Sequence, residues 1–123
     1  MNIGIIGYGS MGKMILEKFI ETKSVEQSKL FVSNRTYKKI MDLNNYYPQL
    51  NICENNIELV KNVDIIFICV KPLEIKVLLS EIVNDIRNTC HIISLNGSIL
   101  FKRLEQISIN NKISKIIPVL WLR

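Results

Sequence analysis

The chain has 123 residues, of which 48% are hydrophobic, and it contains only 5 glycines and 3 prolines. This length and composition predict one globular domain, and they exclude two ordinary domains or a disordered chain. The net charge of +5 comes from scattered lysines and arginines with no basic stripe among aromatics, so we expect no nucleic-acid partner. No apolar run approaches the ~18 residues needed to span a bilayer, so we expect no membrane insertion.

The cysteines indicate neither a disulfide framework nor a metal site. Cys53, Cys69 and Cys90 lie far apart, form no C-x-x-C pair and are odd in number. The single histidine, His91, has no neighbours at ligand spacing, so we expect no bound metal. Reduced thiols and a cytoplasmic location are therefore expected.

Apolar segments alternate with amphipathic helical patterns along the chain, which is typical of parallel βαβ units. Residues 64–70 form a continuous apolar run, as expected of a central parallel strand. Right-handed crossovers predict a Rossmann-like, doubly wound parallel α/β sheet with the strand order 3-2-1-4-5-6. We expect strands at residues 2–6, 30–32, 52, 64–70, 91–95 and 115–120, and helices at 11–20, 36–46, 57–61, 72–86 and 98–106.

A glycine-rich turn falls where the first strand ends and the first helix begins. Gly7, Gly9 and Gly12 match G-x-G-x-x-G in the context that this pattern requires. The first glycine permits a tight turn, the second allows a pyrophosphate to approach, and the third allows close packing of helix and strand. A pyrophosphate would bind the free amides at the helix N-terminus. The predicted dinucleotide-binding segment is Gly7, Tyr8, Gly9, Ser10, Met11 and Gly12.

The segment after the second strand indicates which dinucleotide binds. NAD sites usually carry an acidic residue here for the ribose 2′-hydroxyl, whereas this chain has Ser33, Asn34, Arg35 and Thr36. These side chains can donate hydrogen bonds to a 2′-phosphate, and the Arg35 guanidinium is the best shaped for a forked contact. The alternative is a solvated turn that only caps the next helix. We favour NADP(H), with NAD(H) as the alternative cofactor.

With these motifs the chain resembles the pyrroline-5-carboxylate reductase family, over nearly its whole length and in that family's N-terminal dinucleotide domain. The most family-specific match is the Val70-Lys71-Pro72 element. The other matching segments occur in the family's order and are residues 7–12, 33–36, Asn56, Cys69, Ser94 and 116–118.

The resemblance implies hydride transfer from NADPH to C5 of a cyclic imine, the last step of proline biosynthesis. It implies that Asn56 lies near the adenosine ribose and that Val70, Lys71 and Pro72, which follow Cys69, line the nicotinamide ribose. The residues implied to approach the nicotinamide are Ser94, Leu95, Asn96 and Gly97.

Two segments depart from the family. Residues 94–98 replace the usual small-residue pattern, and Asn96 brings a polar side chain to the expected nicotinamide position. After Pro118 the usual Asn-Thr-Pro is also lacking. Competence-associated paralogues of the reductase depart around the same strand, so a nucleotide-binding or interaction module without reductase activity is one alternative. A dehydrogenase of the hydroxyisobutyrate or 6-phosphogluconate type is another, although Val70-Lys71-Pro72 argues against it.

Reductases of this family add a C-terminal helical domain that forms the dimer and assists catalysis, and nothing in residues 1–123 corresponds to it. We therefore expect residues 1–123 to be a single dinucleotide-binding domain that lacks the C-terminal part of the family fold. Catalytic residues are expected in the missing domain. The apolar segment 116–122 predicts self-association.

We predict that the 123-residue chain alone shows no measurable reduction of the cyclic imine and self-associates. Without a second domain the reactive face of the cofactor is open to water, and no proton donor is positioned beside it. NADPH oxidation tests turnover, and light scattering after size exclusion tests association. Rapid turnover by a monomer would contradict both expectations.

Overall fold

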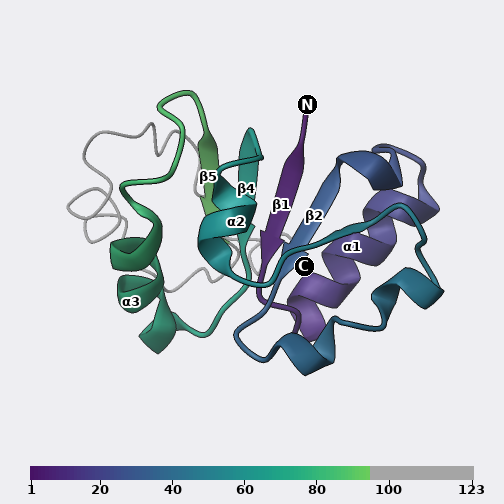
Figure 1. Cartoon of the computed structure of the whole chain (residues 1–123), viewed down its shortest axis with the longest axis horizontal. Coiled ribbons are helices and arrows are strands. Elements are labelled where there is room, and N and C mark those ends of the chain that lie inside the picture. Colours follow the sequence, from purple (N-terminus) through teal and green to yellow (C-terminus); the bar gives the residue numbers. More distant parts are fainter. Residues whose placement is uncertain (95–123) are drawn as a thin grey trace, which may run out of the picture.

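The computed structural model describes residues 1–94, which form a five-stranded parallel sheet in the order β3-β2-β1-β4-β5 (Figure 1). The strands are β1 (Ile3–Ile6), β2 (Leu30–Ser33), β3 (Asn51–Ile52), β4 (Ile65–Ile68) and β5 (His91–Ser94). The helices are α1 (Ser10–Glu21), α2 (Asn56–Val60) and α3 (Pro72–Ile82). The predicted fold class and the order of the first five strands are confirmed. The predicted helix 98–106 and strand 115–120 lie outside the described residues.

Four strands end at the same level of the sheet. Ile6 pairs with Ser33 on one side and with Ile68 on the other, and Ile68 pairs in turn with Ser94. All of these pairs are parallel, so the loops that follow the strands leave from one common edge. This carboxyl edge is where ligands bind in open α/β sheets.

The two faces of the sheet are covered by different helices (Figure 1). Ile3 and Ile5 of β1 are buried in one cluster with Leu16 of α1. Ile6 faces the other way, into a cluster that includes Leu59 of α2 and Leu79 of α3. The alternation along β1 therefore buries both faces, as a central strand of a doubly wound sheet requires.

Gly4 allows α2 to lie close against β1. A Cβ atom at Gly4 would lie 2.5 Å from Cδ2 of Leu59 and 3.2 Å from Cγ1 of Val63. Both of these side chains are fully buried, so they have little room to move away. The missing side chain at Gly4 therefore allows Leu59 of α2 and Val63 to pack directly against β1.

The predicted helix at residues 36–46 was wrong. The chain forms two short 3₁₀ turns there, Tyr37–Lys39 and Leu43–Asn45. The amide of Asn44 donates to the carbonyls of Tyr47 at 3.0 Å and Leu50 at 2.9 Å, which stabilises a turn in competition with the helix. Pro48 follows directly and disfavours a helical conformation at Tyr47.

The helix expected to run to residue 86 ends earlier, at Ile82. Turn-type bonds continue past it, from the amides of Asp85 and Ile86 to the carbonyl of Ile82. Ile86 therefore stays buried beside α3 although it lies beyond the helix. No helix within residues 1–94 combines the length and apolar character needed to cross a membrane.

Candidate functional site

Two of the three motif glycines are required by the backbone itself. Gly7 has φ 99°, a backbone conformation that residues with a side chain rarely adopt. A Cβ on Gly7 would also lie 2.8 Å from the carbonyl oxygen of Cys69. A Cβ on Gly12 would overlap the carbonyl oxygen of Gly7. These contacts hold the start of α1 against the ends of β1 and β4, as the sequence motif predicts.

Gly9 differs from the other two, because a Cβ built on it meets no atom within 4 Å among the described residues. It is the N-cap of α1, has no side chain to cap the helix, and no acidic residue lies in the first turn. The first-turn amides, including those of Ser10 and Met11, therefore have no capping side chain among the described residues. A helix end of this kind binds phosphate groups.

The end of β2 and the segment after it are hydrogen-bonded to the glycine turn. The Gly7 amide donates to the Ser33 carbonyl at 2.9 Å, and the Tyr8 amide donates to Oδ1 of Asn34 at 2.8 Å. The Asn34 amide nitrogen donates in turn to the Thr36 carbonyl at 3.0 Å. Asn34 thus stabilises the loop from within, and the side chains of Arg35 and Thr36 remain exposed.

Arg35 makes an ion pair with a residue far away in the sequence. Its Nη1 lies 3.2 Å from Oε1 of Glu74, in the first turn of α3. The exposed fractions of the two side chains are 85% and 36%. The loop after β2 and the start of α3 therefore meet across the carboxyl edge of the sheet.

A chain of side-chain hydrogen bonds runs from the end of β2 to α3. The buried Ser33 hydroxyl donates to Oδ1 of Asn56 at 2.6 Å. The Asn56 amide donates to Oε1 of Glu81 at 3.1 Å. Asn55, the preceding residue, caps α2 by accepting from the amide of Glu58 at 2.8 Å. The orientation of the Asn56 amide is therefore fixed from both ends.

The segment after β4 approaches the glycine turn from the other side. The Cys69 amide donates to the Ile6 carbonyl at 2.8 Å, and Cγ1 of Val70 lies 3.0 Å from where a Gly7 Cβ would be. Lys71 is the exposed N-cap of α3 and Pro72 begins the helix, where its fixed φ and missing amide hydrogen are favourable. The predicted strand-to-helix transition at Lys71-Pro72 is confirmed.

Burial raises the pKa of both the Cys69 thiol and the Tyr8 phenol, so both groups stay protonated well above neutral pH. It raises the pKa of the Cys69 thiol to about 12. The pKa of the Tyr8 phenol is also raised, first by burial and then by the nearby Tyr47 and Glu17. Cys69 is consequently a packing residue at the edge of the site rather than a thiolate nucleophile.

A cleft of about 210 Å³ lies where these segments meet. It brings together four of the residues predicted from the sequence, namely Gly7, Arg35, Asn56 and Val70. The remainder of its wall comes from Ile6 and from α3, and the α3 residues are Leu73, Glu74, Val77, Leu78 and Glu81. This wall was not predicted, although residues spaced three to four apart after Pro72 share one face of a helix.

Ser94 lies at the end of β5, level with the other strand ends. It is fully buried, and its hydroxyl has no hydrogen-bond partner within residues 1–94. The other residues implied to approach the nicotinamide, Leu95, Asn96 and Gly97, lie outside the described residues.

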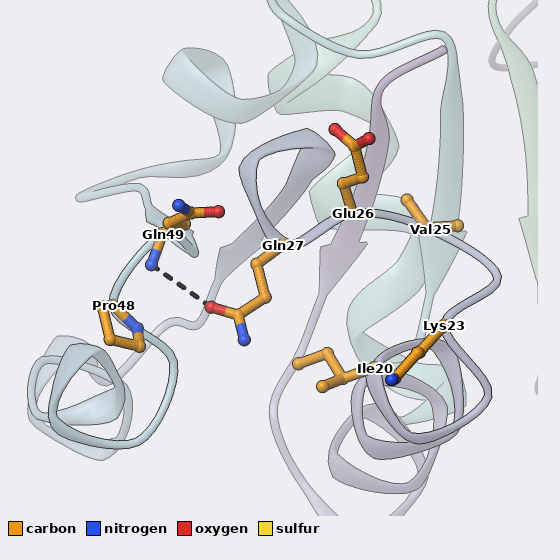
Figure 2. A pocket seen from close by; sticks show the side chains of 7 residues that line it. All are labelled: Ile20, Lys23, Val25, Glu26, Gln27, Pro48 and Gln49. Carbon is orange, nitrogen blue, oxygen red and sulfur yellow. Dashed lines mark hydrogen bonds between the residues drawn. The ribbon is translucent and has the colours of Figure 1, made fainter.

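A larger open hollow of about 610 Å³ lies elsewhere on the described part of the chain (Figure 2). It is lined by Ile20 near the end of α1 and by residues between α1 and β2, with Pro48 and Gln49 opposite. The Gln49 amide donates to Oε1 of Gln27 at 3.2 Å. Lys23 and Glu26 give it charges of opposite sign. It lies toward the amino ends of the strands, away from the glycine turn, so its position does not match that of a ligand site in this kind of sheet.

A doubly wound parallel sheet with this glycine turn at its carboxyl edge defines a dinucleotide-binding domain. Residues 2–97 match the family model described as NADP oxidoreductase, coenzyme F420-dependent, and the chain belongs to that family.

Curated relatives confirm the resemblance noted in the sequence. The chain is 36% identical to ComE operon protein 4 of Bacillus subtilis over 118 residues, which are 96% of this chain and 43% of that protein. It is 35% identical to the pyrroline-5-carboxylate reductase of Methanobrevibacter smithii over 82 residues, which are 67% of this chain and 33% of that protein. The chain therefore spans less than half the length of these relatives.

Solved structures share the fold. The Plasmodium falciparum pyrroline carboxylate reductase, crystallised with NADP bound, matches with a TM-score of 0.75 and 24% identity, covering 94% of this chain and 40% of that one. The pyrroline-5-carboxylate reductase of Coxiella burnetii matches with a TM-score of 0.77 and 24% identity, covering 86% and 39%.

We predict that Gly12→Ala destabilises the fold whereas Gly9→Val does not. Gly9→Val meets open space in the described structure, so the protein should keep its thermal unfolding midpoint while losing dinucleotide binding, because the new side chain occupies the phosphate position. Gly12→Ala should destabilise the fold, because its Cβ overlaps the Gly7 carbonyl. Circular dichroism and a fluorescence titration with NADPH measure the two effects. Retained affinity in folded Gly9→Val would show that this glycine serves only the turn.

We predict that the native chain becomes less stable above about pH 9, because burial raises the pKa of Cys53, Cys69 and Cys90 to about 12. Thiols in the unfolded chain ionise first, so the stabilising contribution is complete below the ordinary thiol pKa and is lost as the pH rises toward 12. Urea unfolding between pH 7 and pH 11 measures the trend. Alkylation by iodoacetamide should be much slower in the native than in the unfolded chain, and equal rates would contradict the burial of these thiols.

Proposed function

We propose that the chain binds NADP(H) and forms the nucleotide-binding part of an oxidoreductase of the pyrroline-5-carboxylate reductase type. The observation that carries the proposal is the open position at Gly9, at the uncapped N-terminus of α1 and on the same edge as Arg35. An open Cβ position and free helix amides together fit a bound pyrophosphate.

The pyrophosphate would be held by the backbone of residues 9–12, with Gly7 and Gly12 keeping that backbone in place. Ser10 and Met11 contribute their amides. Tyr8 contributes mainly by packing, because it is half-buried beside α1. The negative charge of the ligand is favoured by the helix dipole, and the first turn holds no acidic side chain to oppose it.

Arg35 and Thr36 are the exposed candidates for a 2′-phosphate. Ser33 and Asn34 support them indirectly, since their side chains already bond to Asn56 and to the loop backbone. The fixed amide of Asn56 lines the same cleft, which agrees with a place near the adenosine ribose. We therefore assign the adenosine end of the cofactor to this cleft.

The nicotinamide end is assigned to the segment Cys69, Val70, Lys71 and Pro72 and to Ser94, with Leu95, Asn96 and Gly97 beyond it. The cofactor, when bound, supplies the hydride for reduction of a cyclic imine. The contribution of this chain is to hold and orient the dinucleotide, since Cys69 is a neutral thiol and Lys71 is exposed at a helix start. Groups that bind the imine and donate a proton are assigned to parts of the relatives that this chain does not cover.

ComE operon protein 4 matches 96% of the chain, which keeps a nucleotide-binding module without reductase activity as the second candidate. The two proposals share the cofactor site and differ in turnover. NADPH binding together with imine reduction, when this chain is joined to a helical second domain of the reductase type, would support the first. Tight binding with no turnover in that combination would favour the second.

We predict that the chain binds NADPH about tenfold or more tightly than NADH. A charge-assisted contact from Arg35 to the 2′-phosphate contributes on the order of 1.5–3 kcal/mol, and about 1.4 kcal/mol is tenfold in affinity. Arg35→Ala should weaken NADPH binding and leave NADH binding nearly unchanged. Lys38→Ala is the matched control, because Lys38 is an exposed cation in the following 3₁₀ turn.

Fluorescence titration gives both dissociation constants. Equal affinities of the unaltered chain for the two dinucleotides would contradict the assignment of Arg35, whereas failure to bind either would contradict the dinucleotide site as a whole.

A further inference from the structure

The carboxylate that the sequence lacks after the second strand is supplied by α3. Residues 33–36 contain no acidic side chain, yet Oε1 of Glu74 lies 3.2 Å from Nη1 of Arg35. Both residues line the cleft assigned to the adenosine end of the cofactor. The cation proposed to bind a 2′-phosphate is therefore already paired with an anion.

We propose that Glu74 determines cofactor specificity by competing with the 2′-phosphate for Arg35, and so lowers the preference of the site for NADP(H) over NAD(H). The inference rests on the proposed dinucleotide site. Glu74 lies outside both the glycine motif and the segment after β2. Its expected effect is to lower the preference for NADP(H).

The two partners differ in how firmly they are held. The backbone of Glu74 belongs to the first turn of α3, which begins at Pro72. The backbone amide of Glu74 donates to the Lys71 carbonyl at 2.9 Å. Arg35 lies on a loop with 85% of its side chain exposed. An exposed ion pair of this kind is weak, so an incoming phosphate can draw the guanidinium away. The Glu74 carboxylate stays tethered to the start of α3, at the wall of the cleft.

A bound 2′-phosphate would then lie near the Glu74 carboxylate, because both Arg35 and Glu74 line the cleft. The phosphate gains Arg35 but must break the existing pair, and it is repelled by the Glu74 carboxylate, which lines the same cleft as Arg35. A 2′-hydroxyl meets neither cost, because it is neutral and can donate a hydrogen bond to a carboxylate. Glu74 therefore disfavours NADP(H) and tolerates NAD(H).

The other carboxylate in the cleft does not have this arrangement. Glu81 accepts a hydrogen bond from the Asn56 amide at 3.1 Å, about two helical turns beyond Glu74 on α3. Arg35 is paired with Glu74 and not with Glu81 in the described structure. The effect on the 2′ position is therefore assigned to Glu74 alone.

The test compares Glu74→Gln with Glu21→Gln in the complete chain. Both variants remove one negative charge, but Glu21 is the exposed last residue of α1, at the opposite end of that helix from the phosphate site. Dissociation constants are measured for NADPH and NADH, and for 2′,5′-ADP and 5′-AMP, which report on the adenosine end alone. Thermal unfolding of each variant accompanies the titrations, and Glu74→Ala serves as a second variant at the same position.

Glu74→Gln should raise the ratio of NADPH to NADH affinity about three- to tenfold, and the 2′,5′-ADP to 5′-AMP ratio by a similar factor. Glu21→Gln should leave both ratios within about twofold, because its charge is screened at that distance. The effect of Glu74→Gln should shrink in an Arg35→Ala background, because the two residues act on the phosphate together.

An unchanged ratio in folded Glu74→Gln and Glu74→Ala, with both dinucleotides still bound, would overturn this inference and leave the proposed function intact. A lower ratio would overturn it too, and would show that Glu74 positions Arg35 for the phosphate. Failure of the unaltered chain to bind any of the four ligands would overturn the proposed function and the inference with it.

Discussion

The close approach of the start of α1 to the end of β1 is the constraint on which the site depends. Gly12 has no Cβ because the Gly7 carbonyl occupies that space, and Gly7 adopts φ 99° so that the chain can turn directly from strand to helix. Together they aim the first-turn amides of α1 at the carboxyl edge of the sheet. Gly9 contributes nothing comparable to packing, since no described atom lies within 4 Å of its Cβ position. One glycine motif thus combines two structural positions with one that is open to a ligand.

The parallel register turns that local geometry into a site. Because Ile6 is level with Ser33, Ile68 and Ser94, the segments that follow β1, β2, β4 and β5 all leave the sheet from one edge. Amides of Gly7 and Cys69 extend the pairing one residue beyond the strands and hold the segments together. Residues distant in sequence therefore meet because the register of the strands places them at one level.

Much of this could be predicted from the sequence, because the features involved are local. The alternation of apolar strands and amphipathic helices gave the sheet order, and the spacing of Gly7, Gly9 and Gly12 gave the turn. The helix predicted at residues 36–46 does not form. The apolar spacing there is compatible with a helix, but Asn44 and Pro48 stabilise turns that compete with a helix. Helical periodicity reports which face is buried, and it does not weigh side-chain hydrogen bonds to the backbone.

The wall of the cleft was missed for a different reason. Whether a carboxylate stands beside Arg35 is decided by where α3 crosses the carboxyl edge, and residues 35 and 74 are far apart in sequence. Residues 33–36, at the end of the second strand, contain no acidic residue of the kind that NAD sites usually have there. In the folded chain Glu74, on the helix after β4, lies beside Arg35. Cofactor preference is therefore a property of the assembled edge, in which a helix can supply the charge that the strand lacks. Electrostatic complementarity has to be judged between segments, after the topology has placed them side by side.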